Sequence, residues 1–312
     1  MIFNRDLNGA EELHLITGNY YASNDFLLIE QDIRDATDDV ARTIGRPLME
    51  KVDKAYNSIS SEDLPDADTL IPLVQRPVAL LACVRFFRRN DVSHEDSGRK
   101  VKVSTDDSEK IPWEWQLDRD DAVHMEQYYR SMERLITYLN DTKNKDWLET
   151  ESVKLSGTLI IRDADAFERY FPIQSSARLY LLLVPFIREV QIRAIRPAYG
   201  TDKWTELLGD TAVPETDTRF AACKATALLA MSQAIRRMPL QLIPSGVIRG
   251  YLAENGMGAS VPATLDEVAR LSSWLEADAA DWLERMKVFR DGDSGDLEVL
   301  PKNAKRNKYF VT

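Results

Sequence analysis

The sequence predicts a mostly α-helical protein made of two tandem duplicated helical modules, each with a small β element, and an extended C-terminal tail. The first observation is a repeat: the stretch ALLACVRFFRR at Ala79–Arg89 returns as ALLAMSQAIRR at Ala227–Arg237, 148 positions later. The second is that apolar residues recur at spacings of three and four, which places them on one face of a helix. We therefore expect the modules to span residues 1–147 and 148–290, and the tail to span 291–312.

The repeat continues beyond these two stretches in collinear order. A Ser-Gly pair at Ser97 and Ser245 and a Leu-Asp pair at Leu117 and Leu265 keep the offset of 148. Upstream the offset is 154 between the segments IRDATDDVARTIGRP and IREVQIRAIRPAYG, and 157 between the Arg-Asp pairs nearest the start of each module. A tandem duplication followed by small deletions leaves such a series. The alternative is two unrelated helical domains with convergent patterning.

The first module is predicted to open with a short apolar segment, Met1–Phe3, and then a helix. The helix begins near the capping cluster Ser23-Asn24-Asp25 and ends at Gly45 and Pro47, which are residues that stop helices. Its apolar face is expected to consist of Phe26, Ile29, Ile33, Ala36, Val40 and Ile44.

The second module repeats this beginning. Thr158–Ile161 is its apolar segment, and a helix from about Arg178 to Ile195 is expected to stop at Pro197. In both modules a polar linker leads into the repeated apolar stretch. That stretch is expected to form a helix central to the core, whose arginines complement the negative end of the helix dipole.

Each module is predicted to close with a β element and a long helix. The segment SGRKVKVST alternates well enough for a strand, whereas SGVIRGYL is ambiguous. The long helices span about residues 118–140 and 264–290, and Thr264 with Glu267 has the spacing of a capping box. The apolar set of the second is Leu265, Val268, Leu271, Leu275, Trp282, Leu283, Met286 and Phe289.

The candidate functional residues are interface residues. Trp113 and Trp115 are predicted on one side of an extended stretch, where they either anchor that stretch on the module or contact a neighbouring subunit. The tail has no helical period, and a basic run precedes its apolar end. We expect it to fray in isolation or to act as an arm docked on a neighbouring copy. Its candidate contacts are Lys302, Lys305, Arg306, Lys308, Tyr309 and Phe310.

Composition and charge exclude several classes of function. A net charge of −11 disfavours a stable grip on nucleic acid over the whole surface, although a local basic patch stays open. No apolar run has the length of a membrane span, and the first residues lack the pattern of a signal peptide. The two cysteines, Cys83 and Cys223, cannot build a disulfide framework, so we expect buried free thiols and a reducing compartment.

The sequence indicates no catalytic, cofactor-binding or metal-binding residues. His14, His94 and His124 are not spaced with one another or with a cysteine as zinc requires. Neither a nucleophile elbow nor a phosphate-binding glycine loop is present in the sequence. We therefore predict that the protein is not an enzyme, while the many acidic residues leave room for a paired-carboxylate site that no motif marks.

Two segments carry a resemblance to a known family. A helix that ends in a Thr-Gly-Arg turn and an apolar helix that is entered through Pro and left through Arg and Asn are similar to elements of the head-tail connector, or head-completion, proteins of tailed bacteriophages. The stretch covered is Asp25–Asn90. The matching residues are Thr43, Gly45, Arg46, Pro47 and Leu48, then Pro72, Ala79, Leu80, Leu81, Arg88, Arg89 and Asn90.

The whole chain also resembles proteins of similar length and unassigned function from phages and prophages of Bacteroides-type bacteria. It departs from the usual connector in length, because the common form is a single small module.

The resemblance implies a structural virion protein without a cofactor. Connectors form a ring, generally of twelve subunits, below the portal protein, and they extend the DNA channel towards a tail or second ring protein. The expected location is the head-tail junction of a virion assembled in the host cytoplasm, without membrane contact. DNA would be passing cargo only, and an acidic wall would repel it.

Two other function classes stay open. The chain could be a helical adaptor that binds one phage or bacterial protein as a monomer or small oligomer, with one exposed apolar patch. It could also be a hydrolase, which would have a cleft with strongly perturbed carboxylates. Oligomeric state, with and without portal protein, best separates the ring from the other two.

Overall fold

The fold is mostly α-helical, as predicted. Its helices gather into two compact units: unit 1 is Met1–Lys154 with Ser176–Arg178, and unit 2 is Leu155–Ser175 with Leu179–Thr312. The sequence places this division slightly earlier, after residue 147. The computed structural model describes residues 1–20, 23–57, 64–91, 93–95, 98–100, 113–209, 215–238, 248–252, 258–262 and 264–292.

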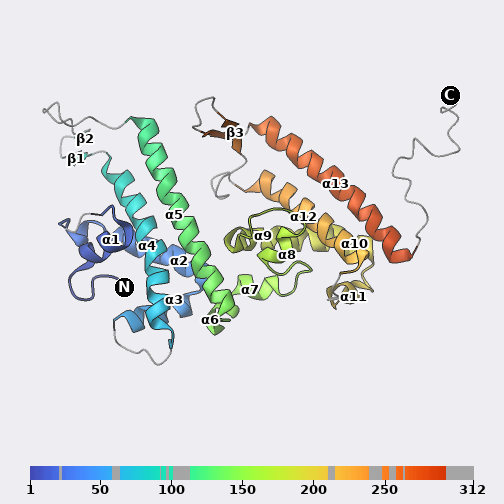
Figure 1. The fold of residues 1–312 in the computed structure, drawn as a ribbon, viewed down its shortest axis with the longest axis horizontal. Coiled ribbons are helices and arrows are strands. Elements are labelled where there is room, and N and C mark those ends of the chain that lie inside the picture. Colours follow the sequence, from blue (N-terminus) through green and yellow to red (C-terminus); the bar gives the residue numbers. More distant parts are fainter. Residues whose placement is uncertain are drawn as a thin grey trace. The chain divides into compact units, whose positions relative to one another are not determined.

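Unit 1 is organised around the apolar helix α4 (Ala67–Asn90), against which α1, α2, α3 and α5 all pack. Helix α5 runs antiparallel to α4, and a two-stranded antiparallel hairpin of β1 and β2 lies between them in the chain (Figure 1). The other elements are α1 (Gly9–Thr17), η1 (Phe26–Leu28), α2 (Glu30–Ile44), α3 (Arg46–Tyr56), β1 (Ser93–Glu95), β2 (Gly98–Lys100), α5 (Glu114–Asp141), α6 (Lys145–Leu148) and α7 (Glu151–Ser156).

The apolar face predicted for the first helix is confirmed, because all six of its residues are buried. They lie on η1 and α2, with Ile29 joining the two elements. Gly45 ends α2 at φ +96°, a conformation that favours glycine, and α3 starts directly after it with Pro47 in its first turn. The sequence predicted the stop but not the new helix, since Pro47 fits the first turn of a helix as well as the end of one.

Helix α4 is the core helix that the repeat predicts. Leu80 and Cys83 have no exposed surface, and Pro72 and Pro77 are accommodated inside the helix. By length and composition α4 could also cross a membrane, but 61% of its most apolar window is buried inside the fold. That burial is expected of a helix at the centre of a packed helical unit.

Helix α5 corrects the prediction for the two tryptophans. Residues from Glu114 onward are helical, so Trp113 is the residue before the helix and Trp115 lies in its first turn, rather than both lying in an extended stretch. On a helix, residues two apart point in different directions, so the two rings do not share one side. Trp113 is 70% exposed and Trp115 is 59% exposed, so neither ring is anchored in the core.

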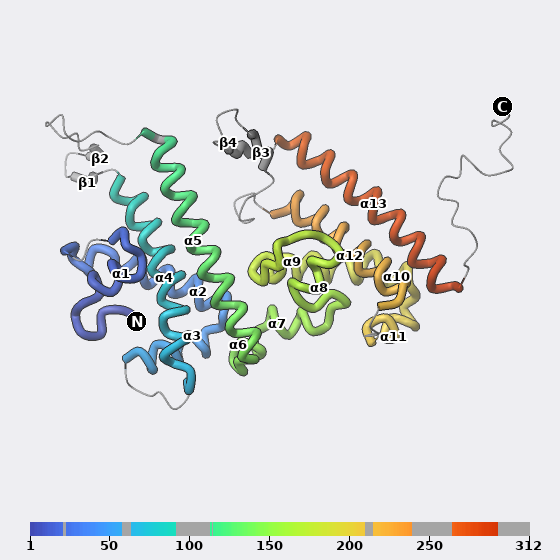
Figure 2. Tube along the Cα trace, viewed as in Figure 1, coloured from blue at the N-terminus to red at the C-terminus, as the bar shows by residue number. Residues whose placement is uncertain are grey.

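Unit 2 has its own pair of long helices, α12 (Asp217–Arg237) and α13 (Leu265–Asp291), which pack along each other (Figure 2). A hairpin of β3 and β4 lies between them in the chain. The other elements are α8 (Ala164–Glu168), α9 (Ala177–Val190), η2 (Gln191–Ile195), α10 (Arg196–Tyr199), α11 (Trp204–Gly209), β3 (Ile248–Leu252) and β4 (Gly258–Pro262).

The prediction that a helix stops at Pro197 is wrong. Helix α9 continues through one π-helical segment, η2, into α10, where Pro197 occupies the first turn. Proline is tolerated there because a first-turn residue needs no amide donor. The chain turns only at Gly200, which has φ +115°.

The core of unit 2 follows the predicted apolar sets only in part. Leu228 is buried on α12 as expected, but Leu229 is only half-buried. Of the predicted set on α13, Val268, Leu275 and Met286 are buried, and Leu271, Trp282, Leu283 and Phe289 are half-buried. On α13 the capping box of Thr264 and Glu267 is confirmed, with the Glu267 amide donating to Thr264 Oγ1 over 3.3 Å. Leu265, in the first turn, is 85% exposed.

Candidate functional site

The two histidines with described side chains serve local structure. His14 Nδ1 donates to the Tyr20 carbonyl over 2.8 Å. His124 is buried, donates through Nδ1 to the Asp120 carbonyl over 2.8 Å, and contacts the Asn19 side chain through Nε2. Sequence reasoning assigned His124 no contact, and no signal could have found this one, because Asn19 lies 105 positions away.

Cys83 and Cys223 are buried free thiols, as predicted. Burial raises the pKa of the Cys83 thiol to about 12 and that of Cys223 to about 11. Because the thiolate is the reactive form, both groups are inert at neutral pH. Over the described parts of the chain, no three His, Cys, Asp or Glu side chains are grouped so that they could hold a metal ion.

Unit 2 contains a cleft of about 300 Å³. Arg290 occupies one side of it and donates to the carbonyls of Ala198 and Tyr199 over 2.8 and 2.7 Å, which ties the end of α13 to α10. It also pairs with Asp291 over 2.7 Å. This guanidinium is therefore used in holding two helices together. The cleft is lined by Tyr199, Lys203, Glu206, Leu207, Thr216, Thr218, Phe289 and Arg290.

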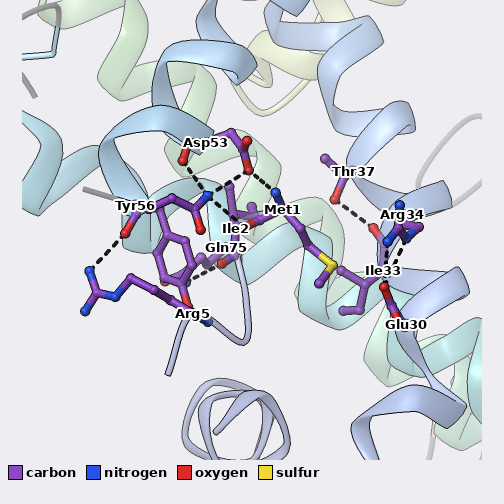
Figure 3. A network of polar contacts seen from close by, with 11 residues as sticks. Met1, Ile2, Arg5, Glu30, Ile33, Arg34, Thr37, Asp53, Tyr56 and Gln75 are labelled. Carbon is purple, nitrogen blue, oxygen red and sulfur yellow. Dashed lines mark hydrogen bonds and ion pairs between the residues drawn. The ribbon is translucent and has the colours of Figure 1, made fainter. Parts of the chain in front are cut away.

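A polar network fixes the first residues of unit 1 on its core (Figure 3). Gln75 Nε2, buried on α4, donates to the Ile2 carbonyl over 2.7 Å, and Arg5 Nη1 donates to the Tyr56 carbonyl over 2.9 Å. The Tyr56 hydroxyl donates to Glu12 over 2.7 Å. Burial and then the bond to Glu12 raise the pKa of Tyr56 to about 12, so the phenol keeps its proton. The network satisfies backbone groups that the buried apolar segment would leave unpaired.

The opening segment of unit 2 is held in a similar way. Gln191 Oε1 accepts from the Ile160 amide over 3.0 Å, and Arg219 Nη2 donates to the Ile160 carbonyl over 2.9 Å. The Tyr180 hydroxyl donates to the Ile161 carbonyl over 2.9 Å. In each unit, long polar side chains from the helices thus hold the apolar segment that the sequence analysis singled out.

The paired arginines of the repeated stretch each bridge two helices. In unit 1, Arg88 Nε donates to Asp121 on α5 over 2.6 Å. Arg89 Nη2 lies 3.0 Å from Asp32 on α2 and donates to the Leu28 carbonyl over 2.7 Å. The first arginine therefore reaches α5, the helix that follows α4, and the second reaches α2, an earlier helix of the unit.

The arginines of unit 2 make the same two connections. Arg236 pairs with Glu276 on α13, the helix that follows. Arg237 Nη1 donates to Glu189 on α9, an earlier helix of the unit, over 2.6 Å. All four arginine side chains are about half exposed, so each ion pair stabilises the fold only modestly. The sequence indicated the arginines through the repeat, but the acidic partners carried no signal, because they lie on other helices.

The stability of the fold is expected to depend on pH through Asp32, the buried carboxyl that faces Arg89 at the end of α4. Burial raises the pKa of its carboxyl, and the Arg89 charge opposes this only in part. The ordinary pKa of an aspartate carboxyl is about 4. When folding raises that pKa, the carboxyl contributes fully to stability below about pH 4. The contribution is lost as the pH rises through the pKa of the folded state. We therefore expect Asp32→Asn to raise the free energy of unfolding at pH 7, and the gain to vanish near pH 4. Urea titrations at both pH values measure this, and a variant less stable than wild type at pH 7 would contradict it.

The eight predicted interface residues divide between described and undescribed parts of the chain. Trp113 and Trp115 are exposed at the start of α5. The six tail residues, Lys302, Lys305, Arg306, Lys308, Tyr309 and Phe310, lie outside the described residues, so the interface prediction for them stays a prediction. Other large apolar side chains at the surface are Leu7, Leu15, Leu27, Leu28, Val123, Leu148, Ile192, Leu265 and Trp274.

Comparison with known proteins places the chain in one family. A family of unknown function, DUF6712, matches residues 40–156 and 196–291, and the chain belongs to it. The first range contains α4, the β1–β2 hairpin and α5, and the second contains α12, the β3–β4 hairpin and α13. Neither a curated protein nor a solved structure matches the chain.

Proposed function

We propose that this DUF6712 member is a structural virion protein that forms a head-to-tail connector ring below the portal of a tailed phage and extends the DNA channel without catalysis. The observation that carries the proposal is the stretch Asp25–Asn90, whose sequence resembles connector proteins. The positions of its matching residues are compatible with that resemblance. Gly45 makes the turn, Leu48 is buried behind it, and Leu80 lies in the centre of the apolar helix.

The proposal includes a duplication of the connector module. Three features support it. The order of elements is the same in both units: an apolar segment, a helix that turns at a glycine of positive φ, a short helix, an apolar helix, a hairpin and a long closing helix. The two arginines at the end of the apolar helix reach the following helix and an earlier helix in both units. The two ranges matched by the family fall one in each unit.

In this proposal, the two arginine pairs help to keep the helices of each unit aligned. A ring subunit must keep its helices in register while DNA passes, and ion pairs join the C-terminal end of each apolar helix to the following helix and to an earlier one. The overall charge of −11 suits a channel wall that lets DNA pass without holding it.

A phage that encodes the chain offers the test. Interrupting the gene with a stop codon should leave portal-bearing heads able to package DNA but unable to receive tails, and supplying the protein in trans should restore joining. Electron microscopy of the lysate counts tailed and tailless heads. Normal tailed particles that lack the protein would contradict the proposal, and would favour the adaptor alternative if a single protein partner is then recovered with the chain.

A further inference from the structure

Two surfaces of complementary chemistry are left unpartnered by the fold. The first, called the arginine surface, consists of Arg188, Ile192 and Arg196 on the continuous helix α9–η2–α10 of unit 2. Steps of four residues keep these side chains on one helix face, and the π-helical segment between them changes this little. All three are exposed, Ile192 to 52%.

Within the part of the chain that the structure describes, the two arginines of the arginine surface are not ion-paired. Its neighbours Arg193 and Arg237 both bind Glu189, over 2.8 and 2.6 Å. Arg188 and Arg196 form no ion pair with any residue that the structure describes. A protein of net charge −11 therefore presents two exposed guanidinium groups on either side of an exposed isoleucine.

The second surface, called the tryptophan surface, is the start of α5 in unit 1. It consists of Trp113, Trp115, Asp118 and Asp120, all of which are exposed. Helical spacing places Trp115 and Asp118 on one side of this helix start and Trp113 and Asp120 on the other. Asp118 forms no ion pair with a described residue, and the Asp120 side chain is 65% exposed although it lies 3.4 Å from His124 Nδ1. Each side of the helix start therefore presents one exposed indole ring and one carboxylate, and tryptophan is enriched at protein interfaces.

We propose that the arginine surface of one copy docks on the tryptophan surface of a second copy. Guanidinium groups bind carboxylates through paired hydrogen bonds and also stack on tryptophan rings, so arginine fits this acidic and aromatic surface better than lysine would. Ile192 adds an apolar contact for an indole ring. The occupant is a second copy of this chain, because its own tryptophan surface supplies both kinds of group that the arginine surface recognises.

This contact joins two different surfaces, so it is heterologous and adds subunits head to tail, closing into a ring when the rotation allows. It rests on the proposed ring but is more specific, because it names which residues of neighbouring subunits meet. It also assigns a partner surface to Trp113 and Trp115.

The test is a charge exchange in the full-length chain. One variant carries Arg188→Glu and Arg196→Glu, and the other carries Asp118→Lys and Asp120→Lys. Sedimentation velocity should show head-to-tail oligomers of the wild type at about 50 mM salt that weaken at about 500 mM, since screening acts on charged contacts. Each variant alone should self-associate at least about tenfold more weakly, and an equimolar mixture of the two should regain association, because the reversed surfaces complement each other.

Matched controls separate this contact from a general effect of charge. Arg130→Glu with Arg134→Glu makes the same charge change on the exposed side of α5, and Asp35→Lys with Asp38→Lys does so on α2. Both should associate as the wild type does, and circular dichroism checks that every variant is folded. A wild-type chain that stays monomeric at every concentration, variants that associate normally, or a mixture that does not recover would each overturn the contact. None of these outcomes depends on whether the protein joins heads to tails, which the stop-codon phage tests separately.

Discussion

Leu80→Ala should lower the free energy of unfolding by about 2–5 kcal/mol, the range for truncating a packed leucine. Leu80 has no exposed surface, and it lies on the helix against which four other helices of unit 1 pack. Alanine would leave a cavity that rigid neighbouring helices fill only in part. Urea denaturation followed by circular dichroism gives the difference between variant and wild type.

The repeated stretch supplies the control for this prediction. Leu228, the counterpart of Leu80, is 5% exposed and should give a loss in the same range when replaced by alanine. Leu229 is only half-buried, so Leu229→Ala should cost clearly less. A loss near zero for Leu80→Ala would show that α4 is peripheral, and it would remove the basis for treating the repeat as the core of each unit.

Trp147→Ala should destabilise the protein by about 3–5 kcal/mol, which is typical of a buried aromatic residue reduced to alanine. The ring is 1% exposed on the short helix α6, and its Nε1 donates to Asn140 Oδ1 over 2.7 Å. The variant would lose both the packed ring and the donor for Asn140.

Two further variants divide that loss into its parts. Trp147→Phe keeps most of the apolar contact but not the donor. Asn140 is exposed, so water can replace that donor, and the lost hydrogen bond should cost about 0.5–1.5 kcal/mol. Leu148→Ala changes a side chain that is 41% exposed, and it should stay within about 0.5 kcal/mol of wild type. Equal losses for Trp147→Phe and Trp147→Ala would mean that the hydrogen bond, rather than the packed ring, is what stabilises α6.

The sequence predicted the features that follow from local periodicity. The apolar helices around Leu80 and Leu228 and the capped start at Thr264 were all evident, because spacing and capping chemistry act within a few residues. Features decided by tertiary contacts were not. The helix that starts after Gly45 and the passage of α9 through a π-helical segment depend on what packs against them, and both Pro47 and Pro197 are compatible with two local structures.

The candidate interface was only partly predictable for the same reason. Trp113 and Trp115 stood out as aromatic residues, but their exposure depends on the start of α5, which the sequence placed a few residues too late. Arg188 and Arg196 gave no signal, because an arginine on a helix is usually a solvated or ion-paired residue. Only the structure distinguishes these two from Arg193 and Arg237, whose charges are bound by Glu189.

The central claim is that this chain assembles into a connector ring on a portal. The most direct measurement is electron microscopy of the purified chain mixed with the portal protein encoded in the same phage genome, with each protein alone as a control. The account predicts a ring of this protein stacked coaxially on one end of the portal and an axial channel continuous through both. Portal rings that remain bare, beside a chain that stays monomeric or forms a small oligomer, would contradict it.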